Sequence, residues 1–392
     1  MINNKITREI NHITNTIKIN KKITEYNVHE PDLRNQNFNF IKKKIEKGWI
    51  SYAGPDVTNF ENKLKNITKS KYVLATSSGT SALHLALKAL NVNKNDEILL
   101  NTLTFIATAN AIRYCDANPH FLDVSGDRPF FQIKELKKYF HKSFHIDEKN
   151  NLINKKTKKN VRVIIITHFL GYVDDNIFEL VKFLKKYNLY IIEDSAGALG
   201  SQVNKIAAGT IGDIGIYSFN GNKIVSTGGG GALLTNKKNF FETSKHLSTT
   251  AKIGARYDYN HDAVGFNYRM SNLSATLGIL QLNKLNIFLR NKKKLHHYYY
   301  KQLQGLDYFH FDYYNSKKNN HNFWINLLIM KNTFKSDYII KKFIKRNIKL
   351  KRIWKPINHI TPYQTYRCMN KGNNALNHYS KYLQLPSSSF LI

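Results

Sequence analysis

The stretch Ser218-Phe-Asn-Gly-Asn-Lys223-Ile-Val-Ser-Thr-Gly228-Gly-Gly-Gly231 places a lysine between a strand end and a run of glycines. Ser218 ends an apolar strand, Lys223 follows five residues later, and four consecutive glycines come next. Upstream, Asp194 ends a second apolar strand in Tyr190-Ile-Ile-Glu-Asp194. A lysine that forms a Schiff base works in a confined site, beside an anchor for an anion and a fixed carboxylate. This part of the chain supplies candidates for all three.

Around this stretch, short apolar runs alternate with segments of helical spacing. Strands are expected at 71–76, 97–100, 161–167 and 189–193, and helices at 81–90, from 108 onward and at 177–187. Such alternation predicts an α/β fold with a mainly parallel sheet that is covered by helices on both faces. Ser271 is expected to cap a long helix that runs from Asn272 to about Leu295.

The pattern of expected strands and helices changes after this helix. The stretch 322–329 is typical of a strand and 336–345 of a short helix, which indicates a smaller α+β domain. We therefore expect an N-terminal helical arm at 1–25, a large domain at 26–285 and a small C-terminal domain at 286–392.

The net charge of +33 admits two interpretations. One is nucleic-acid binding, because clustered basic residues release counterions from phosphates. The other is compositional drift, which we favour because lysine, asparagine and isoleucine are raised together along the whole chain, and no zinc finger or RNA-binding signature is present. We expect no nucleic-acid partner, and the charge would attract an anionic small substrate.

The cysteines and apolar runs bear on location. Cys115 and Cys368 have no paired spacing, which argues against a disulfide framework or a thiolate metal site and favours a reducing cytoplasm. No signal-peptide pattern and no uninterrupted apolar run of about 18 residues is present, so no membrane span is expected.

Each candidate site residue also has an ordinary structural interpretation. Ser78-Gly79-Thr80 joins a strand to a helix N-terminus, where backbone N–H groups favour an anion, but it is equally an ordinary capped turn. Ser218 is either a hydrogen-bond donor to a bound phosphate or an ordinary surface serine. Asp194 lies where ligand crevices form in open sheets, or caps a helix. Phe105 stacks on a flat ring or belongs to the core.

Together, these signals and several other motifs occur in one order. The segments are Ser78-Gly-Thr-Ser-Ala-Leu83, Thr104-Phe-Ile-Ala-Thr108, His168-Phe-Leu-Gly171, Glu193-Asp194, Ser218-Phe-Asn-Gly-Asn-Lys223, the glycine run and Gly265-Phe-Asn-Tyr-Arg269-Met-Ser-Asn. In this order they resemble the DegT/StrS-type sugar aminotransferases, from about Tyr26 to the C-terminus. The resemblance implies the fold type I of pyridoxal-phosphate-dependent transferases, which is that of aspartate aminotransferase.

The resemblance also assigns roles to single residues. Lys223 would bind the cofactor covalently and move the proton, Asp194 would pair with the pyridinium nitrogen, and Phe105 would stack on the ring. The phosphate would be held by Gly79, Thr80 and Ser218, and by Asn267 of the neighbouring subunit in a homodimer with shared sites. His168 would line the cofactor pocket or be purely structural. Arg256 and Tyr257, in the loop at 252–262 that would help to set substrate specificity, would contact the diphosphate or the sugar, or be solvent-exposed loop residues.

A narrower resemblance concerns the substrate. Val28-His29-Glu30-Pro31, Gly48-Trp-Ile-Ser51 and Trp354-Lys-Pro356 are similar to the branch that aminates C4 of a UDP-linked 4-keto-6-deoxy-N-acetylhexosamine for legionaminic-acid and bacillosamine-type surface sugars. The implied reaction is ping-pong, with L-glutamate as the amino donor. The GDP-perosamine branch shares the core motifs and stays open as an alternative.

One position departs from the family. Relatives usually carry glutamine or glutamate three residues after the aspartate, and here this position is Gly197. Gly197 keeps a catalytically silent, cofactor- or sugar-binding relative open. A transcription regulator with an aminotransferase-like domain is disfavoured, because such proteins carry a winged-helix segment of about 60 residues before the match and fewer than 30 are found here.

Overall fold

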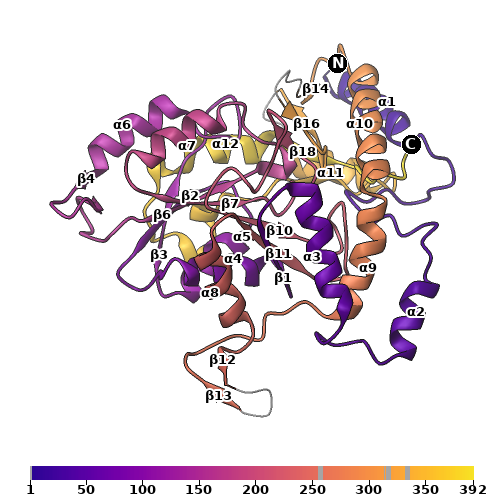
Figure 1. The fold of residues 1–392 in the computed structure, drawn as a ribbon. Coiled ribbons are helices and arrows are strands. Elements are labelled where there is room, and N and C mark those ends of the chain that lie inside the picture. Colours follow the sequence, from indigo (N-terminus) through magenta and orange to yellow (C-terminus); the bar gives the residue numbers. More distant parts are fainter. Residues whose placement is uncertain (1, 255–258, 313, 315–318, 332–335) are drawn as a thin grey trace.

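The computed structural model describes residues 2–254, 259–312, 314, 319–331 and 336–392. Its larger part is a sheet with helices on both faces (Figure 1). The elements of this part are α3 (Pro55–Thr68), β1 (Tyr72–Thr76), α4 (Gly79–Ala89), β2 (Glu97–Asn101), α5 (Ile106–Tyr114), β3 (Asn118–Leu122), α6 (Ile133–Ser143), β6 (Val163–Thr167), α7 (Ile177–Lys185), β7 (Tyr190–Asp194), β10 (Ile214–Ser218), β11 (Gly231–Thr235), α8 (Lys238–Ser248) and α9 (Asn272–Asn283).

Within the described ranges, seven strands form the central sheet in the order β1-β11-β10-β7-β6-β2-β3. The five strands from β10 to β3 are parallel, and β11 runs antiparallel to both of its neighbours, β1 and β10. The expectation of a mainly parallel sheet covered on both faces is therefore confirmed. The parallel strands end at one edge, so the loops that follow them are brought together there.

Alternation along the buried strands explains why helices cover both faces. Along β6, Val163 and Ile165 pack into the cluster formed with α4 and α5, whereas Ile164 and Ile166 pack into the cluster formed with α6 and α7. Successive strand residues point to opposite faces, so a strand that is apolar throughout needs a helical layer on each side. These layers leave the carboxyl edge of the sheet as the natural place for a site.

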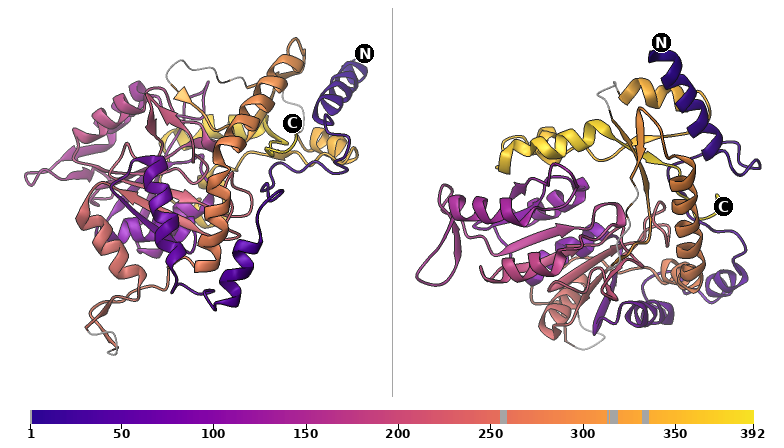
Figure 2. Two further views of the ribbon diagram at one scale, coloured as in Figure 1. Left: turned by 45° about the vertical axis from the view of Figure 1, so that its right-hand side comes forward. Right: turned by 90° about the horizontal axis from the view of Figure 1, so that it is seen from above.

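The smaller part contains an antiparallel sheet with its own apolar core. Its strands are β14 (Phe309–Phe311), β16 (Asn326–Met330), β17 (Lys351–Arg352) and β18 (Tyr382–Leu385), in the order β14-β16-β18-β17, and its helices are α10 (Leu285–Gln302), α11 (Ser336–Ile344) and α1 (Ile2–Ile17). The isoleucines of α1 face this core: Ile6, Ile10, Ile13 and Ile17 are buried with residues such as Phe343. The N-terminal arm thus packs on the smaller part, beside α11 (Figure 2).

Shorter elements connect or flank these two parts. They are α2 (Asn39–Glu46), β4 (Phe144–Ile146), β5 (Leu152–Asn154), β8 (Gln202–Val203), β9 (Ile206–Ala207), β12 (Lys252–Ile253), β13 (Asn260–His261), β15 (Asn319–Asn320) and α12 (Asn373–Lys381), with 3₁₀ turns at Phe169–Gly171, Ile357–His359, Thr361–Tyr363 and Met369–Gly372. The chain returns to the large part near its end, where the Ile357 amide donates to the Thr102 carbonyl at 2.9 Å. None of the described helices combines the length and apolarity that a membrane crossing requires.

Two local expectations are corrected by the structure. Ser271 does cap a helix, and its Oγ accepts from the Ser274 amide at 3.1 Å, but the expected long helix is divided into α9 and α10 at Lys284. Lys284 has φ −102° and ψ 1°, outside the helical range. The strand expected from 322 begins only at Asn326, because Phe323 has a positive φ of 49° and turns the chain.

Candidate active site

A cavity of about 780 Å³ opens at the carboxyl ends of β1, β2, β6, β7 and β10. Most of the predicted site residues line it, namely Gly79, Thr80, Phe105, His168, Asp194, Ser218 and Lys223. Asn267 is exposed and is not part of the lining. Arg256 and Tyr257 lie outside the described residues. The cavity therefore unites seven predicted positions from five segments that are far apart in the sequence.

Lys223 lies on the inner wall, in the loop between β10 and β11. Its Nζ sits 3.8 Å from the centroid of the Trp324 ring. Burial lowers the pKa of Lys223 to about 8, and the Asp194 carboxylate opposes part of this shift. An amine with such a pKa is unprotonated in a useful fraction near neutral pH, as a nucleophile and a proton carrier require.

Asp194 is fixed at the end of β7 by hydrogen bonds to both of its carboxylate oxygens. The Thr108 hydroxyl donates to Oδ2 at 2.6 Å, and the Ala196 amide donates to Oδ1 at 3.2 Å. Thr167 donates to Thr104 at 2.9 Å, and the Thr104 and Thr108 hydroxyls lie 3.1 Å apart, so this chain of hydroxyls points toward Asp194. No helix begins at Asp194, and its interpretation as a helix cap is wrong.

The turn before α4 is a helix cap and also a candidate anion cradle. Ser78 and Ser81 form a reciprocal capping box, with the Ser81 amide donating to Ser78 Oγ at 3.0 Å. The first turn of a helix offers no carbonyl acceptors to its own leading amides, so those of Gly79 and Thr80 are available to a ligand. Both residues line the cavity together with Ser218.

Gly231 explains how this turn and Ser218 come together. The residue lies in β11 between Thr76 of β1 and Ser218 of β10. A Cβ atom at Gly231 would lie 2.4 Å from the Ser78 carbonyl and 2.5 Å from the Gly79 nitrogen. The last residue of the glycine run thus permits the close approach of the helix N-terminus to the sheet.

Phe105 is not a core residue. It precedes α5 with 54% of its surface exposed, and it borders the cavity, where its ring lies 6.0 Å from that of Trp354. An exposed aromatic face at a cavity wall can stack on a flat ring.

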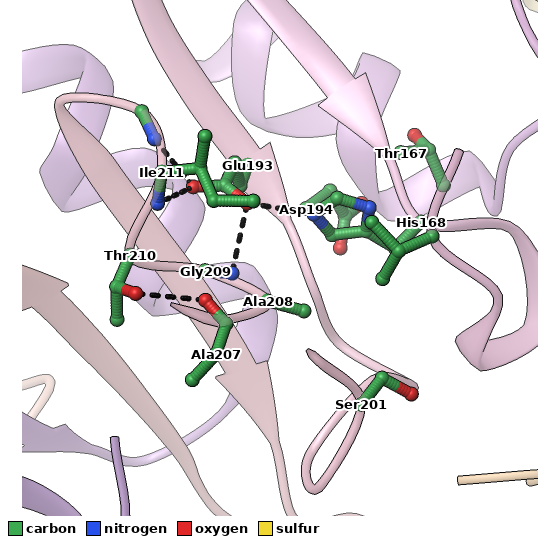
Figure 3. A network of polar contacts seen from close by, with 12 residues as sticks. Thr167, His168, Glu193, Asp194, Ser201, Ala207, Ala208, Gly209, Thr210 and Ile211 are labelled. Carbon is green, nitrogen blue, oxygen red and sulfur yellow. Dashed lines mark hydrogen bonds and ion pairs between the residues drawn. The ribbon is translucent and has the colours of Figure 1, made fainter. Parts of the chain in front are cut away.

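His168 is held by the neighbouring strand. Its Nε2 lies 2.7 Å from Glu193 Oε2, and both side chains are buried. The other Glu193 contacts are backbone amides: Gly209 donates to Oε2 at 2.8 Å and Ile211 to Oε1 at 2.6 Å (Figure 3). Glu193 thereby ties His168 to the loop after β9, and His168 lines the cavity as well, so a structural role and a place in a cofactor pocket are compatible.

Several cavity residues were not among the predicted site residues. They are His29, Trp324, Lys349, Lys351, Arg352 and Gln384. Burial and the ammonium groups of Lys292 and Lys223 hold the pKa of His29 well below its ordinary value, so its imidazole is neutral at pH 7. His29 and Trp354 did lie in motifs of the narrower resemblance, which was the one available signal. The basic residues were hidden among many other lysines and arginines.

The comparisons with known proteins agree with this geometry. Residues 31–391 match the DegT/DnrJ/EryC1/StrS aminotransferase family. GDP-perosamine synthase of Escherichia coli O157:H7 is 31% identical over 336 residues, which is 86% of each chain. UDP-4-amino-4,6-dideoxy-N-acetyl-beta-L-altrosamine transaminase of Campylobacter jejuni is 29% identical over 351 residues, 88% of this chain and 87% of the relative.

Solved structures show the same fold. The aminotransferase PseC of Helicobacter pylori, which takes part in pseudoaminic acid biosynthesis, superposes with a TM-score of 0.82 at 22% identity and covers 94% of this chain and 95% of its own. The fold is that of the pyridoxal-phosphate-dependent transferases of fold type I. The chain belongs to the DegT/DnrJ/EryC1/StrS aminotransferase family and is a pyridoxal-phosphate-dependent sugar aminotransferase.

Proposed function

We propose that this enzyme moves an amino group from L-glutamate to C4 of a nucleoside-diphosphate-linked 4-keto-6-deoxyhexose. The observation that carries the proposal is the joint placement of Lys223, Asp194 and the α4 N-terminus around one cavity. Lys349, Lys351 and Arg352 line the same cavity, and Lys349 and Arg352 also pair with Glu25 and Asp337. Cationic side chains in the lining suit both the diphosphate of such a substrate and the carboxylates of glutamate.

The residues present fit pyridoxal phosphate. The amides of Gly79 and Thr80 and the Ser218 hydroxyl offer donors for the phosphate, and the space between them is kept by Gly79, where a Cβ would lie 3.0 Å from that of Ser218. Asp194 would pair with the ring nitrogen, and Phe105 would stack on the ring. His168 would line the pocket while Glu193 fixes it.

The chain's own groups then divide the work. Bound pyridoxal phosphate supplies an electron sink for breaking the bond to hydrogen at the substrate carbon. Lys223 Nζ would take that proton from the substrate carbon and deliver it to the C4′ carbon of the cofactor. Asp194, with both oxygens hydrogen-bonded, would keep the ring nitrogen protonated. The buried walls around Lys223 would limit access of water during these steps.

The identity of the nucleotide is the finer part of the proposal. We place a UDP-linked N-acetylhexosamine first, because of the segments 28–31, 48–51 and 354–356, and surface-polysaccharide or nonulosonic-acid biosynthesis as its use. A GDP-linked sugar is the second candidate, since relatives named GDP-perosamine synthases match at 31% and 32% identity.

A homodimer with shared sites is also proposed. The α2 helix has no buried residue, and exposed apolar side chains surround it, namely Leu33, Phe38, Ile45, Trp49, Ile50 and Tyr52. An eight-residue helix without a buried face is marginal in water and is best stabilised by a partner surface. In such a dimer Asn267 would reach the phosphate of the neighbouring subunit. The free Cys115 and Cys368 suit a cytoplasmic enzyme.

A spectroscopic experiment tests the proposal. Purified protein is mixed with pyridoxal phosphate, and the visible band of lysine-bound cofactor is recorded before and after L-glutamate. We expect a band that glutamate removes and that borohydride reduction fixes on Lys223, as shown by peptide mapping. UDP- and GDP-linked 4-keto-6-deoxy sugars are then compared for restoring the band. A label on another lysine, or a band insensitive to glutamate, would contradict the assignment, and Lys223→Ala serves as the inactive control.

A further inference from the structure

The space beside Gly197 is filled by an aromatic ring from a distant part of the chain. A Cβ atom at Gly197 would lie 2.3 Å from Cε3 and 2.5 Å from Cζ3 of Trp324. The φ of Gly197 is not in the positive range, so its backbone accepts any residue and the indole is the obstacle. Glycine at 197 is therefore required by the ring and not by the turn.

Trp324 is fixed in this place by three hydrogen bonds of its own and one that its neighbour Asn322 makes. Its backbone amide donates to Asn322 Oδ1 at 2.9 Å, and the Asn322 side-chain amide donates to the Gly197 carbonyl at 2.8 Å. Its carbonyl accepts from the buried Lys292 Nζ at 3.0 Å. Its indole Nε1 donates to the Asn222 carbonyl at 2.8 Å. With 3% of its surface exposed, the ring has little freedom to move.

Two of these features act on Lys223. The indole N–H holds the carbonyl of Asn222, the residue directly before the lysine. The indole face lies under the Lys223 Nζ, 3.8 Å from the ring centroid, within the range of a cation–π interaction. One side chain therefore fixes both the backbone next to Lys223 and the end of its side chain.

We propose that Trp324 is a positioning residue for Lys223, and that Gly197 and Trp324 form a size-matched pair which occupies the place where a longer side chain at 197 would otherwise stand. The ring gives the amino group a defined resting place on the cavity wall, from which it meets the incoming cofactor carbonyl. This inference deepens the proposed function and rests on it for the role of Lys223, whereas the pairing of 197 with 324 does not depend on it.

The pairing is tested by stability of the cofactor-free protein. We expect Gly197→Ala to lower Tm by about 2–5 °C in the wild-type background, because the new methyl group displaces the ring. In a Trp324→Leu background the same substitution should leave Tm unchanged or raise it slightly, since the space is then free. Equal effects in the two backgrounds would overturn the pairing.

The positioning role is tested by the kinetics of cofactor capture. Pyridoxal phosphate is mixed with wild-type, Trp324→Phe and Trp324→Leu protein, and the initial binding step is separated from the first-order rise of the lysine-bound band. We expect Trp324→Leu to slow the first-order step at least about tenfold with the initial affinity kept, and Trp324→Phe to recover most of the rate because it retains a ring. An unchanged first-order step in Trp324→Leu would refute the role.

These two arms separate the claims. If wild-type protein captures no cofactor, the proposed function fails, while the coupling between Gly197 and Trp324 is still measured by Tm. If capture is normal but no coupling or rate effect is found, only the inference about Trp324 fails.

Discussion

Lys223 carries a charge in a place that disfavours it. At neutral pH the wild-type protein must keep a partly buried ammonium group beside an indole, and burial lowers the pKa of that group from 10.5 to about 8. The same environment that makes the amine reactive therefore costs stability. This trade-off is common at sites where a pKa is tuned for chemistry.

The stability cost has a pH signature. Because the folded-state pKa of Lys223 is lower than the unfolded value, the unfolded chain binds more protons between about pH 8 and pH 10.5. The free energy of unfolding should therefore rise with pH across this window. Part of the side chain still faces the cavity, so we expect about 1–3 kcal/mol rather than the full value of the shift.

The matched measurement uses Lys223→Met without cofactor. At pH 7.5 the variant should be more stable than the wild type by about 1–3 kcal/mol in urea unfolding, and the difference should shrink toward pH 10. Because both proteins share all other charges, the general effect of pH cancels in the comparison. A difference that is constant over this range, or that grows with pH, would contradict the lowered pKa.

At the residue scale, sequence order predicted the site better than any single residue did. Lys223 is one of many lysines, yet its place after Ser218 and before the glycines put it on the cavity wall. The contact of Trp324 with Lys223 was not predicted. It depends on a turn at Phe323, where φ is positive and where the sequence had indicated a strand. Long-range contacts of this kind have no local signal in one sequence.

At the scale of elements, strand β11 brings together the parts of the candidate anion cradle. It brings Ser218 and the N-terminus of α4 to opposite sides of Gly231. The sequence indicated each part, since the glycine run and Ser78-Gly79-Thr80 both stood out. The sequence did not show that β11 is the one strand between these two parts. The order of strands in a sheet depends on crossover connections, which hydrophobic periodicity does not encode.

Gly231→Ala tests this assembly. The added methyl group would collide with the Ser78 carbonyl and the Gly79 nitrogen, so the helix N-terminus must move away from Ser218. We expect at least about tenfold weaker binding of pyridoxal phosphate, because phosphate contacts depend on close positioning of the donors. Titration followed by absorbance measures the affinity.

The control for this variant is Gly126→Ala. At Gly126 an added Cβ meets only Asn374 at 3.7 Å, an ordinary contact, and the residue is not part of the cavity lining. It should bind the cofactor like the wild type. Inorganic phosphate provides a second probe: if Gly231→Ala keeps both phosphate and cofactor affinity while the protein is folded, the cradle does not depend on this close approach.

At the scale of the whole molecule, the sequence predicted the N-terminal helix but not the exposed apolar surface. The arm at 1–25 was expected as a helix, and its isoleucines at 6, 10, 13 and 17 now show which surface it covers. The exposed apolar side chains near α2 were not predicted, because an apolar residue in a sequence can equally belong to the core or to an interface with a second copy. The ribbon places α2 at the edge of the molecule (Figures 1 and 2), and the exposure of the neighbouring apolar residues follows only from the three-dimensional structure.

The dimer is the last prediction and is tested by mass in solution. A chain of 45.5 kDa should give a particle of twice that mass by light scattering, more completely at about 300 mM salt than at low salt, because each copy carries a net charge of +33 and screening weakens the repulsion.

Ile45→Glu combined with Ile50→Glu places two carboxylates among the exposed apolar side chains near α2 and should give a monomer. Ile344→Glu is the matched control, since Ile344 on α11 is 50% exposed, against 52% and 53% for the other two. If the double variant keeps the wild-type mass, or the control loses it as well, the surface near α2 is not the interface. If the wild type is itself a monomer at every salt concentration, each copy must complete its site without a neighbour, and the role given to Asn267 falls with the dimer.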